Sequence, residues 1–317
     1  MTYGADRMTG SVSVVIPCRN EEENAAGIAA AVIAELESAK VDFDLIFIDN
    51  ASNDRTVEII RELCSADPRI KLIVNTRNFG QMRSPTHGIF AARGDAVIAM
   101  CADFQDSPNL LPRFIERWRT GVDIVLGVRE KEKSTLLFGS MRKVFYALSR
   151  TIGEYPIIPN ATGFGLYDRK VVDSIAHLNE PEPFFRGLLV ETGYTIEIIP
   201  YPRPGRLRGL SNNNFFTLLD FALSGLASSS KKLIRLPFFI SVLCGAIAGV
   251  SMIAAVVAAS FGSGAITWLI AGGIEVQFAL LFGFIGLIGD QVRMTSERTR
   301  RTPLVIERER INFPAGS

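Results

Sequence analysis

The chain has 317 residues, enough for one large domain or two of ordinary size, and apolar residues make up 48% of it. Its 34 Lys and Arg nearly balance its 33 Asp and Glu, which argues against a nucleic-acid-binding protein with a broad basic surface. The four cysteines form no CxxC pair and the two histidines lie far apart, so neither a disulfide framework nor a zinc or histidine site is indicated.

The first part of the chain alternates between short β-branched runs and helical segments. Residues 1–11 are polar and lack an apolar core, so we expect no secretory signal and a first domain that stays in the cytosol. The expected strands are residues 12–16, 45–48, 70–74, 96–100 and 123–127. The expected helices are residues 22–38, a segment ending near residue 64, residues 79–93 and residues 109–119. This alternation predicts an α/β domain with a doubly wound, mostly parallel sheet.

Polar residues follow every expected strand. They are Arg19-Asn20-Glu21, Asp49-Asn50, residues 75–80, residues 103–106 and Arg129. Because ligands bind at the carboxyl ends of the strands in such sheets, we expect one site at this edge. The sequence has no GxGxxG or GxxxxGK[ST] motif, so neither a dinucleotide fold nor a P-loop is predicted. A diphosphate would instead need a divalent ion held by carboxylate and amide oxygens, which indicates Mg²⁺ or Mn²⁺.

Two long apolar runs occupy the last third of the chain. Residues 236–261 carry no charge, and residues 265–289 carry only Glu275. Since a membrane-crossing helix needs about 20 apolar residues, both runs predict transmembrane helices, paired as a hairpin within residues 233–290. Basic residues flank the outer ends of the hairpin, while its loop has none. The positive-inside rule therefore predicts a plasma (inner) membrane protein with both termini in the cytoplasm.

The predicted organisation is a cytosolic domain (1–213), a juxtamembrane segment (214–232), the hairpin and a cytosolic tail (291–317). The juxtamembrane segment has the helical spacing of an amphipathic helix on the membrane, although a buried helix would show the same pattern. Arginines and lysines between residues 203 and 235 suit a lipid-linked phosphate, although a solvated loop would account for the lysines. Glu275 fits a protonated or hydrogen-bonded side chain at a helix interface better than a contact in a lipid path or between subunits.

An ordered set of motifs spans nearly the whole chain. The motifs are VVIPCRNEEEN (14–24), FIDNASNDRT (47–56), RNFGQ (77–81), GDAVIAMCADFQDSP (94–108), GVRE (127–130), TGFGLYDRKVV (162–172), FFRGL (184–188), RLRGLSNNNF (206–215) and RTPLVIERERINF (301–313). With these motifs the chain resembles the family 2 glycosyltransferases of the GT-A fold. The likeness is to the branch of dolichol-phosphate mannose synthases and bactoprenol-phosphate glucosyltransferases.

The resemblance implies roles for the matching positions. The expected nucleotide-binding residues are Pro17, Asn20, Glu21, Asp49, Asn78, Gln81 and Asp95. Asp103 and Gln105 would hold Mg²⁺ or Mn²⁺ on the diphosphate, and Asp103, Arg129 and Arg186 form the expected catalytic set. The residues expected at the acceptor phosphate, which Arg186 would also approach, are Arg203, Arg206, Arg208 and Ser211.

Three positions depart from the family pattern. Cys101 replaces the first aspartate of the Asp-x-Asp motif, Asn50 replaces a second acidic residue, and Gly163 stands where many relatives carry an aspartate proposed as a base. Mg²⁺ commonly needs only one or two carboxylates plus substrate phosphates, so Asp103 and Gln105 can suffice. A phosphate monoester is mostly dianionic at neutral pH and needs less base assistance than a hydroxyl group. The losses therefore fit a phosphate acceptor.

The function that the resemblance implies is an inverting transfer of one sugar from a nucleotide-diphosphate sugar to polyprenyl (undecaprenyl or dolichyl) phosphate. A UDP-sugar is favoured over GDP-mannose as the donor. One alternative is transfer to a hydroxyl group of a glycan or lipid. The other is a catalytically silent nucleotide-sugar-binding scaffold or flippase partner, which Cys101 and Gly163 would favour. The hairpin also offers helix faces for a homo-oligomer.

Overall fold

The structure is a computed structural model that describes residues 7–130, 158–181, 183–202 and 303–314, with scattered helical positions between 273 and 299. The strands are β1 (Val12–Cys18), β2 (Phe43–Asp49), β3 (Ile70–Asn75), β4 (Ala96–Ala99), β5 (Ile124–Arg129), β6 (Ala161–Asp168), β7 (Ile196–Tyr201) and β8 (Glu307–Ile311). The helices are α1 (Ala25–Ser38), α2 (Thr56–Ala66), α3 (Gly80–Ala91), the 3₁₀ turn η1 (Pro108–Leu110), α4 (Leu111–Arg119), α6 (Arg169–His177) and α7 (Phe185–Glu191).

These strands form one sheet in the order β7-β5-β6-β4-β1-β2-β3-β8. β1 pairs in parallel with β2 and β4, and β2 pairs in parallel with β3. The expected parallel core and its helices are therefore confirmed to within a few residues at each end. β6, which no pattern predicted, runs antiparallel to both β4 and β5. Because β6 runs antiparallel to both of its neighbours, β4 and β5 point the same way. β7 pairs in parallel with β5.

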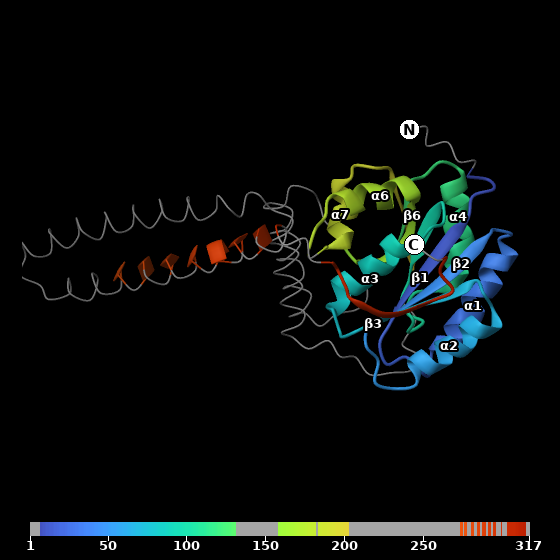
Figure 1. Ribbon diagram of the computed structural model, residues 1–317. Helices are drawn as coiled ribbons and strands as arrows, with labels where there is room; N and C mark the ends of the chain where they lie inside the picture. Colours follow the sequence, from blue (N-terminus) through green and yellow to red (C-terminus); the bar gives the residue numbers. More distant parts are fainter. Residues whose placement is uncertain are drawn as a thin grey trace, which may run out of the picture.

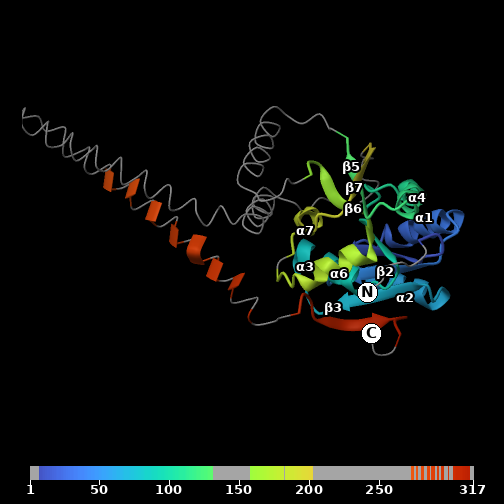
Figure 2. The same cartoon turned by 90° about the horizontal axis from the view of Figure 1, so that it is seen from above.

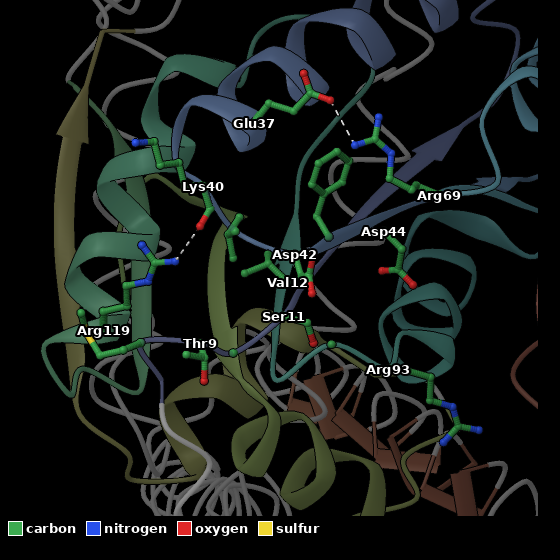
Figure 3. Close-up of a pocket in the computed structure, with 15 residues that line it drawn as sticks. Thr9, Ser11, Val12, Glu37, Lys40, Asp42, Asp44, Arg69, Arg93 and Arg119 are labelled. Carbon is green, nitrogen blue, oxygen red and sulfur yellow. Dashed lines mark hydrogen bonds and ion pairs between the residues drawn. The ribbon is translucent and has the colours of Figure 1, made fainter.

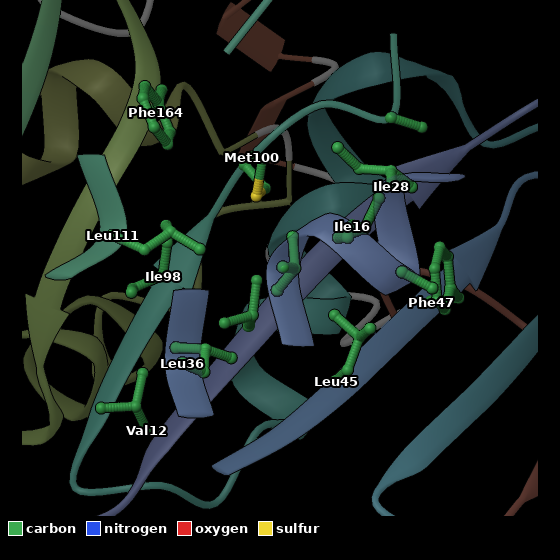
Figure 4. Packing of buried hydrophobic residues seen from close by; sticks show 14 of the residues in the cluster. Val12, Ile16, Ile28, Leu36, Leu45, Phe47, Ile98, Met100, Leu111 and Phe164 are labelled. Carbon is green, nitrogen blue, oxygen red and sulfur yellow. The ribbon is translucent and has the colours of Figure 1, made fainter. Parts of the chain in front are cut away.

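Helices cover both faces of the sheet (Figures 1 and 2). Alternate residues of β1 therefore enter two separate apolar clusters. Val14 and Ile16 pack with residues of α1, α2 and α4, whereas Val15 packs with residues of α3, α6 and α7. Figure 4 shows Ile16 among the apolar side chains of the first cluster. A strand buried on both faces has no polar side, which is why these strands read as continuous apolar runs.

The C-terminal segment returns to the sheet. It was expected only as a tail, but residues 307–311 form β8, which pairs antiparallel with β3. Figure 2 shows this strand, in red, beside β3. The side-chain amide of Asn312 donates to the carbonyl oxygens of Cys64 (2.7 Å) and Ile70 (2.8 Å), which fastens the end of β8 to the domain. The sequence ERERI has no apolar run, because β8 is an edge strand with mostly charged side chains.

Glu307 holds the start of β8 against α3. Its carboxylate accepts hydrogen bonds from Arg310 Nε (2.8 Å) and contacts His87 Nε2 (2.5 Å). Burial raises the pKa of Glu307, but the hydrogen bonds from Arg310 and His87 outweigh it, so the pKa lies below its ordinary value of 4.5. A depressed carboxyl pKa stabilises the fold above the unfolded-state pKa, and this stability is lost as the pH falls through the folded-state pKa.

We therefore expect Glu307→Gln to lower the free energy of unfolding at pH 7, and the gap from the wild type to close below about pH 4. Thermal unfolding between pH 7 and pH 3 measures this gap, and hydrogen exchange of the β8 amides shows whether the strand is the part released. A gap that stays constant over the whole range would contradict this role of Glu307.

The membrane predictions fall largely on residues that the structure does not describe. The juxtamembrane segment (214–232), the first span (236–261) and Glu275 lie outside the described residues, and the second span (265–289) is described only in part. Among the described residues, none of the helices combines the length and apolar character needed to cross a membrane. The scattered helical positions do carry exposed apolar side chains, including Ile274 (47% exposed), Ile288 (61%) and Val292 (62%).

Candidate active site

The polar loops predicted from the sequence lie together at the carboxyl edge of the sheet. β1 lies between β4 and β2, so the loop with Asp103 and the end of β2 with Asp49 flank the end of β1. Two strand spacings, about 10 Å, separate these two strands. Arg129 ends β5, which points the same way as β4. The structure therefore brings Asp49, Asp103 and Arg129 to a single edge.

Hydrogen bonds fasten the loops after β1 and β2 to each other. Asn20 adopts a left-handed backbone (φ 56°), its amide donates to Ser52 Oγ (2.9 Å), and its side-chain oxygen accepts from the amide of Asn53 (2.9 Å). Asp49 is fully buried and accepts from the amide of Ser52 (3.0 Å). Burial raises the pKa of Asp49 overall, although the hydrogen bonds from Ser52 lower it. Asp49 is thus a rigid acceptor at the floor of the site.

Two further predicted residues border this floor. Pro17 lies in β1 and pairs with Ile48 of β2. Glu21 follows β1, and its carboxylate accepts a hydrogen bond from the side-chain amide of Asn24 (2.7 Å). Both therefore lie at the carboxyl end of β1, where the sequence predicted nucleotide contacts.

Asn50 has a structural reason to be an amide. Its side-chain nitrogen donates to Asn78 Oδ1 (2.8 Å) and to the carbonyl of Gly80 (3.1 Å), while its oxygen accepts from the amide of Phe79 (2.9 Å). A carboxylate accepts hydrogen bonds but cannot donate them, so it could not make the first two contacts. Asn50 therefore fixes the RNFGQ loop, with Asn78 at its exposed rim and Gln81 on the first turn of α3.

The loop after β4 presents the predicted metal ligands. Phe104 adopts a left-handed backbone (φ 58°), and Asp103 Oδ1 accepts from the amide of Gln105 (3.2 Å), which makes a tight turn. Asp103 is half-buried and Gln105 is buried. One carboxylate and one amide oxygen are the hard ligands that Mg²⁺ and Mn²⁺ take, and the set suits an ion completed by substrate phosphates and water.

Asp106 was not predicted, although it lies in the motif quoted for the metal ligands. Its side chain is 1% exposed and forms an ion pair with Arg129 (3.1 Å). It also accepts from Tyr201 Oη (2.8 Å) and from the amide of Cys101 (3.0 Å). One buried carboxylate therefore joins the β4 loop to the ends of β5 and β7.

Arg129 is held in this cluster as a permanent cation. Burial lowers the pKa of Arg129, but the hydrogen bond to Tyr201 (3.2 Å) and the attraction of Asp106 outweigh it, so the pKa is raised. Burial and the charge of Asp106 raise the pKa of Tyr201, which keeps the phenol protonated as a donor. The result is a fixed guanidinium at the carboxyl edge, ion-paired with Asp106.

Arg186 lies on α7 beside the start of β6. Its guanidinium donates to the carbonyl of Ala161 (2.9 Å), and Ala161 pairs with Val128 near the end of β5. Gly163 has a φ of +92°, and a Cβ there would lie 3.8 Å from Arg186 Cγ. The structure thus brings Arg186 to the site, and it gives a backbone reason for the glycine that replaces the family's aspartate.

We expect Gly163→Asp to lower the free energy of unfolding by about 1–2 kcal/mol, because side chains with a Cβ are strained at positive φ. Its carboxylate would also pair with Arg186 and reduce sugar transfer. Gly121→Asp is a matched control, since Gly121 has a φ of +106° and no atom within 4 Å of its Cβ position. Thermal unfolding and a transfer assay on both variants test this, and higher activity in Gly163→Asp would contradict it.

Asp95 does not belong to this edge. It precedes β4, and its carboxylate accepts from the amide (2.8 Å) and hydroxyl (3.0 Å) of Ser11 at the opposite edge of the sheet. The nucleotide-binding role predicted for Asp95 is therefore wrong, because a residue before a parallel strand cannot reach the site after it. The predicted acceptor residues Arg203, Arg206, Arg208 and Ser211 lie outside the described residues.

A cavity of about 770 Å³ opens at that opposite edge, between the starts of β1 and β2 (Figure 3). Its charged lining is largely engaged within the protein: Arg69 pairs with Glu37 (3.0 Å), and Arg119 donates to the carbonyl of Ala39 (3.4 Å). Ligands of open α/β sheets bind beyond the carboxyl ends of the strands. We therefore place the candidate active site at the carboxyl edge.

Solved structures place the fold in a known class. The chain is similar to glucosyl-3-phosphoglycerate synthase from Mycobacterium tuberculosis in complex with Mn²⁺, UDP and phosphoglyceric acid, with a TM-score of 0.50 and 20% identity. The match covers 70% of this chain and 78% of that one. The mixed sheet thus has the GT-A-like fold.

Sequence comparisons define the family. Residues 13–176 match Glycosyl transferase family 2, and the chain belongs to this family of enzymes. It is 34% identical to the bactoprenol glucosyl transferase of Shigella phage SfX over 74% of this chain and 78% of that protein. It is 31% identical to a prophage bactoprenol glucosyl transferase homolog of Escherichia coli (strain K12) over 93% and 97% of the two chains. An uncharacterized glycosyltransferase of Bacillus subtilis (strain 168) is 30% identical over 93% and 92%.

Proposed function

We propose that this enzyme transfers one sugar from a nucleotide-diphosphate sugar to a polyprenyl phosphate at the cytosolic face of the membrane. The observation that supports a polyprenyl phosphate acceptor is the likeness to the E. coli bactoprenol glucosyl transferase homolog over almost the full length of both chains. We favour a UDP-sugar over GDP-mannose, because the relatives from Shigella phage SfX and E. coli are named for glucosyl transfer.

We assign different parts of the carboxyl edge of the sheet to the nucleotide, the divalent ion and the acceptor. Asp49 and the loops that Asn20 and Asn50 fix would receive the nucleotide at the β1–β2–β3 end. Asp103 and Gln105 would hold a divalent ion, which when bound acts as a Lewis acid on the diphosphate. Arg129 and Arg186 lie toward β5 and β6 and would counter the negative charge of the donor diphosphate and of the acceptor phosphate. In the sequence, the arginines expected at the acceptor come after β7, which is the first strand in the sheet order.

The proposed reaction is one in-line displacement. An oxygen of the polyprenyl phosphate forms a bond to the anomeric carbon, while the bond from that carbon to the diphosphate oxygen breaks. The electron pair of that bond leaves with the nucleoside diphosphate. Because the phosphate oxygen attacks the face opposite the leaving group, the configuration at the anomeric carbon is inverted. The acceptor is mostly dianionic at neutral pH, and no proton has to be removed. Gly163 in place of an aspartate is compatible with this, because the protein's main contribution is positioning and charge.

We also infer that residues 236–261 and 265–289 form a membrane hairpin with the catalytic domain and both termini in the cytoplasm. Support comes from the lengths of the apolar runs, the basic flanks and the exposed apolar side chains of Ile274 and Ile288. Protease protection in inverted and right-side-out membrane vesicles tests the orientation. Cleavage of the catalytic domain in right-side-out vesicles would reject it.

A transfer assay tests the function. Membranes with the full chain are incubated with a panel of radiolabelled UDP- and GDP-sugars, MgCl₂ and undecaprenyl phosphate, and the organic phase is extracted. We expect label in a lipid product that mild acid releases, as for a sugar phosphodiester. The same panel with undecaprenol, which carries a hydroxyl group, distinguishes the alternative acceptor class. Nucleotide binding without transfer to either acceptor would favour a silent scaffold and reject the proposal.

A further inference from the structure

Arg308 lies in an irregularity of β8 at the carboxyl end of β3. Val74 of β3 pairs with Glu309, whereas the next residue, Asn75, pairs with Glu307. Arg308 is therefore an extra residue in a β-bulge. Bulges bend the strand, re-aim a side chain and occur often beside active sites. We propose that Arg308 binds the nucleoside diphosphate of the sugar donor, an inference that rests on the proposed function.

The strand register puts Arg308 within reach of the nucleotide floor. Asp49 of β2 pairs with Val74 of β3, and Val74 pairs with Glu309, the neighbour of Arg308. These residues form a row across three strands, and two strand spacings amount to about 10 Å. An extended arginine side chain covers much of that distance. Arg308 can therefore reach a ligand that lies over Asp49.

The electrostatics agree with this geometry. Burial raises the pKa of Asp49, and hydrogen bonds from Ser52 together with the charge of Arg308 lower it. The two side chains are thus close enough to attract each other. A nucleotide lying on Asp49 would be within the same range of the guanidinium.

Arg308 has a charge available for a ligand. It is exposed and makes no hydrogen bond or ion pair with any residue in the described part of the chain. Its acidic neighbours are engaged elsewhere, Glu307 with Arg310 and Glu309 with Arg61. A guanidinium has a fork of donors that matches phosphate oxygens, and the donor diphosphate is the anion expected at this edge.

The position favours the donor over the acceptor. β8 and β7 are the two ends of the sheet order, and the arginines expected at the acceptor phosphate follow β7. Arg308 adjoins β3 and the nucleotide loops instead. A segment that follows the second predicted span thereby completes the donor site. This would account for the return of the chain to the sheet after residue 303.

Titration of the full chain in detergent with UDP or GDP, each with MgCl₂, tests the inference by isothermal calorimetry. We expect Arg308→Ala to weaken binding of the preferred nucleotide about 10- to 100-fold, as for the loss of a hydrogen bond to a charged group. Arg308→Lys should recover part of the affinity because it keeps the charge. Arg61→Ala is the matched control: it removes another guanidinium bound to β8, through Glu309, and should leave nucleotide affinity unchanged.

Each outcome has a distinct meaning. If the wild type binds neither nucleotide, the proposed function fails. If the wild type binds but Arg308→Ala binds equally well, the inference about Arg308 alone is overturned. It is also overturned if Arg61→Ala weakens binding as much, because the effect would then come from β8 docking. In steady-state assays, Arg308→Ala should raise KM for the nucleotide sugar, and a raised KM for undecaprenyl phosphate alone would contradict the assignment.

Discussion

Asp103→Ala is expected to lower sugar transfer by about 10²–10³-fold. Asp103 is the carboxylate that the β4 turn presents beside Gln105, and its loss would remove the charged oxygen ligand proposed for the divalent ion. Stabilisation of a departing diphosphate by a metal is worth several kcal/mol, and each 1.36 kcal/mol is a factor of ten in rate. The fold should persist, because Asp103 is only half-buried and its carboxylate accepts from the amide of Gln105 within the same loop.

The measurement is the rate of sugar transfer as a function of MgCl₂ concentration. Resistance to extraction at alkaline pH shows whether each variant is inserted in the membrane. Asp42→Ala is a suitable control, since Asp42 lines the cavity at the opposite edge of the sheet. We expect the control to match the wild type and Asp103→Ala to lose the metal-dependent rate. If Asp103→Ala kept the wild-type response to MgCl₂, Asp103 would not be a metal ligand.

The parallel core could be predicted from the sequence because its signal is local. A strand such as β1, buried on both faces, is apolar at most positions, and its helix follows directly in the chain. β8 gives no such signal, since its residues are polar and its partner β3 lies more than 200 residues earlier. β6 was missed because glycines interrupt it, and Gly165 is required where a Cβ would lie 2.4 Å from the carbonyl oxygen of Val125.

The sequence could predict which residues lie at the carboxyl edge, because strand direction determines this. Asp49, Asp103 and Arg129 each follow a parallel strand, so the topology alone brings them to one edge. Asp95 belongs to the same motif as Asp103, but it precedes β4 and its hydrogen bonds to Ser11 hold it at the opposite edge. Asp106 and Tyr201 could not be paired from sequence, because their contact joins a loop and the end of a strand that are 95 residues apart.

Two of the three departures from the family pattern have structural explanations, so they do not indicate an inactive protein. Asn50 is needed as a donor to Asn78 and Gly80, and Gly163 is needed for a backbone with positive φ. Both substitutions thus follow from the local structure of this chain. Cys101 has no comparable explanation from its side chain, although its amide donates to Asp106.

Asp106→Asn is expected to affect stability and catalysis together. Asp106 is 1% exposed and pairs with Arg129, which is 16% exposed. Removing one partner of a buried ion pair costs about 3–5 kcal/mol, and we expect the lower end because Arg129 retains some solvent contact. An asparagine can still accept from Tyr201, but it no longer neutralises the guanidinium. Arg129 would then shift, and a misplacement of about 1 Å can lower a rate roughly 10²-fold.

A matched control separates the two effects. Asp123 is also buried and ion-paired, with Lys170 (2.7 Å) and Arg7 (2.9 Å), but it lies at the opposite edge of the sheet. Asp123→Asn should therefore lose stability while keeping kcat, whereas Asp106→Asn should lose both, with little change in KM for the nucleotide sugar. Thermal unfolding and steady-state kinetics below the unfolding temperature provide the comparison. Equal kcat in the two variants would show that Asp106 only stabilises the fold, and that the position of Arg129 does not depend on it.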